Sequence, residues 1–119
     1  MQEGARQIYE GKHQFHGASG RQYDYHLPQN LNSIPAVAGN YMFAIRQNQN
    51  EDWWVLYVGE SENLRNRLVD NRHEKMDECL LFADPYPVYI LYDANRWSKG
   101  GRRNAEKDLI DSEGPSLNP

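Results

Sequence analysis

Residues 39–59 read GNYMFAIRQNQNEDWWVLYVG, and they contain two almost continuous apolar runs. The runs cover residues 41–45 and 53–58, and a polar tract over residues 47–52 separates them. Short apolar runs bounded by turn signals are typical of strands that are buried on both faces. The stretch therefore predicts a buried antiparallel hairpin, and Gly59 is expected to end its second strand.

The segment before this hairpin predicts a second, amino-terminal hairpin. Residues 13–26 alternate aromatic and polar side chains on either side of the turn signal Gly17-Ala18-Ser19-Gly20. This alternation is typical of a half-buried strand. Residues 28–38 are rich in Pro, Asn and Ser and are expected to form a loop.

The segment after the hairpin predicts two helices and one strand. Ser61 can serve as the N-cap of a helix from about residue 62 to 73. Residues 88–92 read VYILY and predict a third core strand. A final helix from about residue 102 to 112 is expected to stop at Gly114-Pro115.

These elements predict an α+β fold. We expect a three-stranded antiparallel core sheet flanked by helices, with the amino-terminal hairpin as an added edge. A chain of 119 residues is long enough for one hydrophobic core. The expected domain therefore spans residues 1–119, with a hairpin and loop extension over 1–38 and the core over 39–119.

Composition excludes several classes of protein. The chain is 39% hydrophobic, yet no apolar run approaches the length of about 20 residues that crosses a bilayer. The first residues lack a signal-peptide pattern, so the expected location is the cytoplasm. Cys79 is the only cysteine, which excludes intrachain disulfides and Cys-rich zinc sites. We expect this thiol to pack in the core.

Charge is unevenly distributed along the chain. The net charge is −4, and residues 51–119 carry nine Lys and Arg against fourteen Asp and Glu. Proteins that grip nucleic acid over a broad surface use many cationic side chains to neutralise phosphates. Any activity on nucleic acid must therefore rest on a local site.

A series of short motifs follows in a recognisable order. The motifs are Gly39-Asn40-Tyr41, Tyr57-Val58-Gly59, Arg67, Glu106 and Asn118. In this order the chain resembles the GIY-YIG nuclease family over residues 39–118. The pattern of aromatic residues and glycines over 15–25 also looks like the lead-in of small stand-alone bacterial and phage members.

The resemblance implies a role for each matching residue. Glu106 would bind Mg²⁺ or Mn²⁺, because a carboxylate is a hard oxygen ligand. Arg67 would hold the phosphate through its planar guanidinium. Tyr41 would orient or deprotonate the attacking water, and Tyr57 is the second candidate for this role. Because a free tyrosine has a pKa of about 10, deprotonating the water would require a nearby cation that lowers this pKa. Asn118 would cap or orient the site unless it belongs to a frayed terminus.

His73 fits the family pattern less well. It lies six residues after Arg67, and on a continuous helix it would be ~240° away around the axis. His73 would face the site only if the helix had already ended. We keep it as a hypothetical general base or phosphate ligand, and we note that Asn40 replaces the isoleucine of the family name.

Each of these residues also has a purely structural interpretation. Tyr41 and Tyr57 could be strand tyrosines with buried rings and hydroxyls at the rim. Arg67 could be a solvated helix residue. Glu106 could pair with Arg102, four residues earlier on the same helix, in an ordinary surface ion pair.

A basic and aromatic cluster precedes the last helix. Residues 95–101 read NRWSKGG, which predicts a flexible loop. Exposed aromatic rings can stack on unpaired bases, and cations can contact phosphates. We expect substrate contacts from the residues Trp97, Lys99, Arg102 and Arg103. The alternative is a solvated loop with a tucked-in indole.

The sequence thus predicts a divalent-metal-dependent endonuclease that acts on nucleic acid, with DNA favoured over RNA because most of the family acts on DNA. Two alternatives stay open. One is a catalytically silent module that binds nucleic acid or a protein. The other is a nuclease effector or toxin that a protein inhibitor controls.

Overall fold

The computed structural model describes residues 11–48 and 51–119, which form an α+β fold. One antiparallel sheet contains five strands in the order β1-β2-β5-β3-β4. The strands are β1 (Lys12–His16), β2 (Gln22–His26), β3 (Gly39–Ile45), β4 (Trp54–Ser61) and β5 (Tyr89–Ala94). The helical segments are η1 (Leu31–Ser33), η2 (Asn66–Asp70), α2 (Glu74–Ala83) and α3 (Lys99–Glu113). The predicted α+β class is confirmed.

The central hairpin has the predicted character. β3 is buried along its whole length, and it lies between β4 and β5 in the sheet. Its register with β4 runs from Gly39 opposite Ser61 to Ile45 opposite Trp54, with a bulge between Phe43 and Ala44. A strand with neighbours on both sides and side chains packed on both faces has to be apolar throughout.

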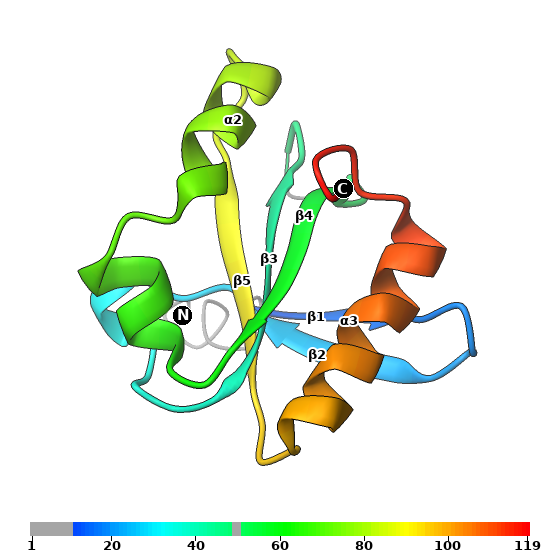
Figure 1. Ribbon diagram of the computed structural model, residues 1–119. Coiled ribbons are helices and arrows are strands. Elements are labelled where there is room, and N and C mark those ends of the chain that lie inside the picture. Colours follow the sequence, from blue (N-terminus) through cyan, green and yellow to red (C-terminus); the bar gives the residue numbers. More distant parts are fainter. Residues whose placement is uncertain (1–10, 49–50) are drawn as a thin grey trace, which may run out of the picture.

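The amino-terminal hairpin was expected as an added edge beside a three-stranded core, and in the structure it is part of one five-stranded sheet. β2 pairs with β5 at His26 and Tyr92. Figure 1 shows this hairpin running across the direction of β3, β4 and β5, so the sheet is strongly curled. The sequence could not predict this single junction, because no local pattern marks where two hairpins meet.

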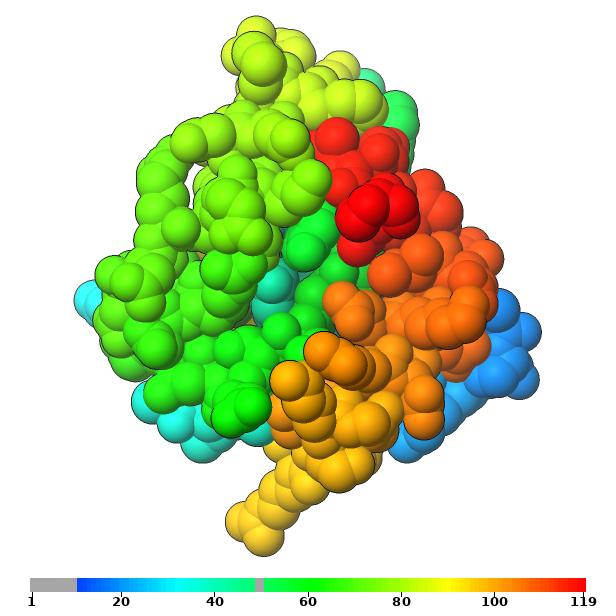
Figure 2. Space-filling view, viewed as in Figure 1, coloured from blue at the N-terminus to red at the C-terminus, as the bar shows by residue number. Residues whose placement is uncertain are grey.

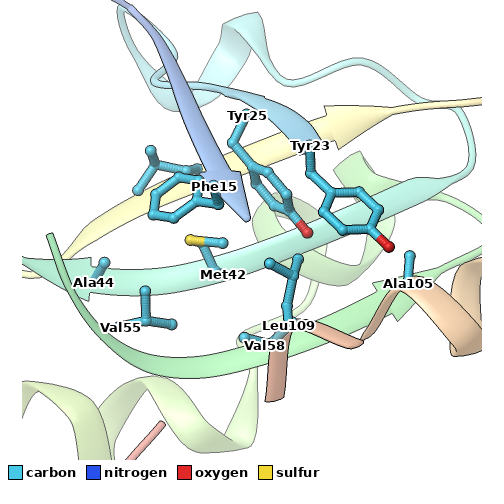
Figure 3. Packing of buried hydrophobic residues seen from close by; sticks show 10 residues of the cluster. Phe15, Tyr23, Tyr25, Met42, Ala44, Val55, Val58, Ala105 and Leu109 are labelled. Carbon is cyan, nitrogen blue, oxygen red and sulfur yellow. The ribbon is translucent and has the colours of Figure 1, made fainter. Parts of the chain in front are cut away.

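Two hydrophobic clusters cover the two faces of the sheet. One cluster, shown in Figure 3, packs α3 against β1–β4 through residues that include Phe15, Tyr25, Met42, Val58 and Leu109. The other packs η2 and α2 through residues that include Phe43, Leu56, Leu64, Cys79 and Ala83. Cys79 is fully buried, as expected, and burial raises the pKa of its thiol to about 11. Side chains of β3 alternate between the two clusters.

The predicted helix over residues 62–73 is shorter in the structure. Asn63 Oδ1 accepts a hydrogen bond from the Asn66 backbone N–H at 3.0 Å, and the π-helical segment η2 ends at Asp70. Ser61 closes β4 but still accepts from the Asn63 N–H at 3.0 Å. Asn63 therefore caps the start of this helical segment, whereas at its end the Asn71 Nδ2 donates to the Asn66 carbonyl at 3.1 Å and to the Asn66 Oδ1 at 2.6 Å.

Helix α2 was not predicted from the sequence. Only Cys79 and Ala83 are buried in this helix, whereas three consecutive apolar residues, 80–82, are exposed. An amphipathic helix is recognised by apolar residues three and four positions apart. In α2 the exposed apolar residues 80–82 interrupt this spacing, so the pattern is difficult to recognise.

The last helix begins earlier than predicted. Ser98 caps α3 by accepting a hydrogen bond from the Gly101 N–H at 3.1 Å, so Gly100 and Gly101 are helical and not part of a loop. The helix ends at Gly114, whose φ of 58° is the left-handed conformation that glycine favours. Within the described ranges, no helix is both long and apolar enough to cross a bilayer.

Candidate active site

The two glycines of the motif pair allow close packing around Tyr41. Tyr41 lies opposite Gly59 in the β3–β4 pair, and a Cβ atom on Gly59 would overlap the Tyr41 ring. A Cβ atom on Gly39 would overlap the Asp93 carbonyl and the Leu64 side chain. The Tyr41 ring therefore lies across β4 only because position 59 has no side chain.

Tyr41 and His73 form a buried hydrogen-bonded pair. The distance from Tyr41 Oη to His73 Nε2 is 2.6 Å, and both side chains are 2% exposed. His73 Nδ1 accepts a hydrogen bond from the Lys75 backbone N–H at 3.0 Å. A neutral imidazole has one donor and one acceptor nitrogen, so its proton lies on Nε2. His73 then donates to the Tyr41 oxygen.

His73 reaches Tyr41 because the preceding helix ends early. After Asp70 the chain becomes extended at Asn71, with φ −121° and ψ 134°. His73 is also extended and is the N-cap of α2. His73 therefore does not belong to the helix that carries Arg67. The helix has ended before His73, which is the condition under which His73 could face the site.

Tyr57 completes an aromatic cluster around His73. Its ring centre lies 5.3 Å from that of His73, 5.8 Å from that of Phe43 and 6.4 Å from that of Tyr41. Tyr57 is only partly buried, and its hydroxyl makes no hydrogen bond to another of the described residues. Tyr57 is therefore more accessible than Tyr41.

Arg67 links this cluster to α2. Its Nη2 lies 2.9 Å from Glu74 Oε2, and a hydrogen bond from Arg67 to Tyr41 lowers the pKa of the phenol. The Arg67 side chain is 34% exposed, so a ligand can reach it. Arg67 holds the pKa of Glu74 down at about 2.

Burial keeps both members of the Tyr41–His73 pair neutral. It raises the pKa of Tyr41 well above its ordinary value, against the opposing effect of Arg67. It also lowers the pKa of His73 to about 4, and the positive charge of Arg67 adds to this shift. At neutral pH the pair therefore consists of a phenol and an uncharged imidazole.

Glu106 approaches the tyrosines from α3. Its negative charge contributes to raising the pKa of both Tyr41 and Tyr57, so it lies within electrostatic reach of both. Figure 2 shows a recess between the green segment that carries η2 and the orange α3, with strands at its floor. Arg67 belongs to η2 and Glu106 to α3, the two elements on either side of this recess.

The expected surface pair between Arg102 and Glu106 is not formed. Arg102 is 5% exposed, and its Nε donates to Glu60 Oε1 at 3.0 Å while Nη1 donates to the Trp97 carbonyl at 2.8 Å. Glu106 has no hydrogen bond or ion pair within the described part of the chain. Burial and the charge of Glu60 raise its pKa. The ion pair with Arg102, which was the structural alternative for Glu106, is therefore absent from the structure.

The carboxylate of Glu106 fits a divalent cation. It is half-buried, it forms no ion pair with a described residue, and a second carboxylate, that of Glu60, outweighs the opposing effect of Arg103 and disfavours its charge. Mg²⁺ keeps several waters and takes only one or two protein carboxylates. Among the residues that the structure describes, no cluster of three or more His, Cys, Asp or Glu could hold a metal. A cation here would thus depend on Glu106 together with substrate and water.

Asn118 is fastened to the edge strand. Its Oδ1 accepts from the Val58 N–H at 2.8 Å, and its Nδ2 donates to the Val58 carbonyl at 3.0 Å. The Leu117 N–H donates to the Leu56 carbonyl at 2.8 Å, and Pro115 is buried. Asn118 is therefore ordered and positions β4 next to Tyr57.

Asn40 is a positioning residue that the sequence did not reveal as such. It is 1% exposed, its Nδ2 donates to the Arg102 carbonyl at 2.9 Å, and its Oδ1 accepts from Asn95 at 3.1 Å. These bonds tie β3 to the first turns of α3, one turn before Glu106. A polar side chain inside an otherwise apolar buried strand was the available signal.

The basic and aromatic cluster is only partly accessible. Trp97 packs against Tyr23, with ring centres 6.1 Å apart, and the Arg21 guanidinium lies 4.7 Å from the indole centre. The Trp97 indole therefore packs against the protein, and Arg102 forms an ion pair with Glu60. Lys99 and Arg103 are exposed, and Arg103 lies near enough to Glu106 to lower its pKa.

Comparison of the chain with models of protein families, with curated proteins and with solved structures finds no match. The chemistry of the site therefore rests on the residues described above.

Proposed function

We propose that this protein is a divalent-metal-dependent endonuclease of the GIY-YIG type that hydrolyses phosphodiester bonds in DNA. In this proposal β3, β4 and β5 with the helices beside them correspond to the family's three-stranded core. The observation that carries the proposal is the Tyr41–His73 hydrogen bond, with Arg67 and the unpaired Glu106 beside it.

Tyr41 is the group that acts on the attacking water. Its oxygen receives hydrogen bonds from His73 Nε2–H and from Arg67, and both bonds favour the phenolate over the phenol. Burial opposes that ionisation in the free protein. Tyr41 therefore orients the water first and accepts its proton once an additional positive charge is nearby.

Arg67 holds the scissile phosphate. Its guanidinium is partly exposed and is bound to the exposed carboxylate of Glu74 in the free protein. A phosphodiester presents the same type of oxygen acceptor and the same single negative charge, so it can replace the exposed Glu74 carboxylate at little cost. Lys99 and Arg103 then contact neighbouring phosphates along the strand.

Glu106 supplies the ligand for Mg²⁺ or Mn²⁺. When bound, such an ion stabilises the negative charge that develops on the phosphoryl and leaving oxygens during in-line attack. The raised pKa of Glu106 is consistent with this role, since a carboxylate that lacks a partner gains from binding a cation. Asn40 and Arg102 hold the helix that presents Glu106.

Plasmid cleavage tests this proposal. Supercoiled DNA is incubated with the protein and Mg²⁺ or Mn²⁺, in parallel with Glu106→Ala and Glu113→Ala. Glu113 is a matched control because it is also a half-buried glutamate on α3 whose pKa is raised by burial. We expect cutting by the unmodified protein and by Glu113→Ala only. Cutting that survives chelation, or that survives Glu106→Ala, contradicts the assignment.

One alternative, a module that binds nucleic acid without cutting, has a specific observation in its favour. Burial raises the pKa of Tyr41, so in the free protein its phenol stays protonated at neutral pH and cannot accept a proton from water. A retarded band of labelled DNA without any cleavage, in the presence of either metal, would support this alternative over the nuclease.

A further inference from the structure

An exposed apolar surface lies at the end of β3 and β4 that is away from Tyr41. Seven large hydrophobic side chains are exposed in the described part of the chain, and five of them belong to α2, the turn after it and the start of β4. These five are Trp54, Leu80, Leu81, Phe82 and Tyr86. Contiguous apolar surface of this kind marks a site of interaction with another molecule.

A groove of about 400 Å³ opens within this surface. One wall comes from the β3–β4 hairpin and includes Ile45 and Trp54, and the other includes Phe82 and Tyr86. Trp54 and Phe82 meet edge to face, with ring centres 6.2 Å apart. Gln47 Nε2 donates to Tyr86 Oη at 2.8 Å across the two walls. The groove is therefore preformed, and its volume suits a few side chains of a partner.

The rim of the groove is acidic. It carries the exposed carboxylates of Glu51, Asp52 and Asp84. Among the described residues that line the groove, Arg46 is the one cation, and its guanidinium lies 4.0 Å from the centre of the Trp53 ring. Trp53 does not line the groove, so the contact with its ring holds the Arg46 guanidinium away from the groove. The rim thus favours positive charge on a partner.

We propose that this groove binds a segment of a partner protein that carries a large apolar side chain flanked by lysine or arginine. The apolar side chain enters the groove and packs on Trp54 and Phe82, and the flanking cations meet the three rim carboxylates. Phosphate groups of nucleic acid would be repelled by the same carboxylates. A symmetric contact with a second copy would bring the acidic rims face to face.

This surface does not depend on the proposed nuclease chemistry. Ile45 and Trp54 pair at one end of the hairpin, whereas Tyr41 and Gly59 pair further along it. A partner bound in the groove leaves the recess between η2 and α3 open. Binding here would therefore recruit the protein or bring it to a substrate without blocking the site.

Titration with short synthetic peptides tests the proposal. The probes are a peptide with one tryptophan flanked by lysines, its counterpart flanked by glutamates, and a lysine peptide with serine in place of tryptophan. We expect the first peptide alone to bind saturably and to shift the NMR resonance of the Trp54 indole. Phe82→Ser should weaken this binding by about tenfold, which corresponds to ~1.4 kcal/mol.

Matched variants distinguish peptide binding in the groove from nonspecific binding to exposed apolar side chains. Leu31→Ser removes a similarly exposed apolar side chain outside the groove and should leave peptide binding unchanged. Asp52→Lys should weaken binding of the lysine-flanked peptide. The proposal is overturned if that peptide does not bind up to its solubility limit, or if the glutamate-flanked or serine peptide binds equally well. It is also overturned if sedimentation shows a dimer that Phe82→Ser dissociates.

Discussion

At the scale of single residues, the site depends on groups that burial keeps uncharged. Tyr41 and His73 are enclosed by β3, β4 and the start of α2, and their hydrogen bond has a definite direction because Lys75 occupies His73 Nδ1. Arg67 and Glu106 carry charge at the border of this enclosed region. The proposed chemistry uses both kinds of group, since the neutral Tyr41 acts on the water while the charged Arg67 and Glu106 hold the phosphate and the metal.

Tyr41→Phe tests the role of the hydroxyl. The ring and its packing over Gly59 are kept, so the protein should fold, with a loss of about 1 kcal/mol from the missing hydrogen bond. We expect metal-dependent cleavage to fall by about 10²–10⁴-fold. Tyr57→Phe is the comparison, because Tyr57 neighbours the same ring cluster. A larger loss in Tyr57→Phe than in Tyr41→Phe would transfer the role to Tyr57.

The lowered pKa of His73 predicts a dependence of stability on pH. The folded-state pKa of about 4 lies below the ordinary value of 6.5, so the folded state favours the neutral imidazole. This contribution is complete above pH 6.5 and is lost as the pH falls through 4. We expect a decrease of about 2 kcal/mol in the free energy of unfolding from this residue.

His73→Asn isolates that contribution. Asparagine keeps an N-cap acceptor for the Lys75 N–H but does not titrate. Denaturant unfolding of both proteins between pH 7 and pH 4.5 should show a smaller decrease for the variant. Arg67, Glu74 and Lys75 face His73 in both proteins, so their effects are common to the two. Equal decreases would show that His73 is not the source.

Glu74→Gln tests whether Glu74 competes with phosphate for Arg67. The substitution removes the ion pair at 2.9 Å, so a Glu106→Ala protein that also carries it should bind DNA a few-fold more tightly at low salt. Asp77→Asn is the control, because it removes the same charge from the same helix but frees Arg72 instead. An equal gain from Asp77→Asn would mean that only net charge matters.

Part of this site was predictable from individual residues. The motifs directed attention to Tyr41, Tyr57, Arg67 and Glu106 because their types and order follow a known chemical pattern. The contact of His73 with Tyr41 depends on the early end of η2, where the Asn71 side chain bonds to Asn66. The burial of Arg102 depends on Glu60, a residue 42 positions away. Such long-range partners leave no local signal.

At the scale of elements, β3 and β4 hold the site together. Their apolar runs were sufficient to predict them, because a strand buried on both faces admits few polar residues. The helix α2 was missed because three consecutive apolar residues, 80–82, are exposed and obscure its buried face. One of these residues, Phe82, lines the groove, so the failed prediction and the inferred interaction share a cause.

Gly59→Ala tests the packing of the hairpin. The added methyl group would overlap the Tyr41 ring, and we expect a loss of about 1–3 kcal/mol in the free energy of unfolding. Gly100→Ala is the matched control, because the nearest atom to its added Cβ would be Ser98 Oγ at 3.8 Å. That variant should be as stable as the original or slightly more stable. Chemical denaturation measures both, and equal stabilities would contradict the packing account.

At the scale of the whole molecule, the sheet carries different helices on its two faces. The cluster of α3 covers one face and the cluster of η2 and α2 covers the other, and α3 packs mainly against the edge strand β4. Asn118 secures that edge. Residues from both faces can therefore meet around β4. A chain with a net charge of −4 has little general attraction for DNA, so the local site must supply it.

The most direct measurement compares plasmid cleavage by the unmodified protein, Tyr41→Phe, Glu106→Ala and the double variant, each with Mg²⁺. If the two residues serve one reaction, each single variant loses most of the activity and the double variant is no slower than the slower single variant. Unchanged cleavage by Glu106→Ala, or losses that multiply in the double variant, would contradict a single site built from Tyr41 and Glu106.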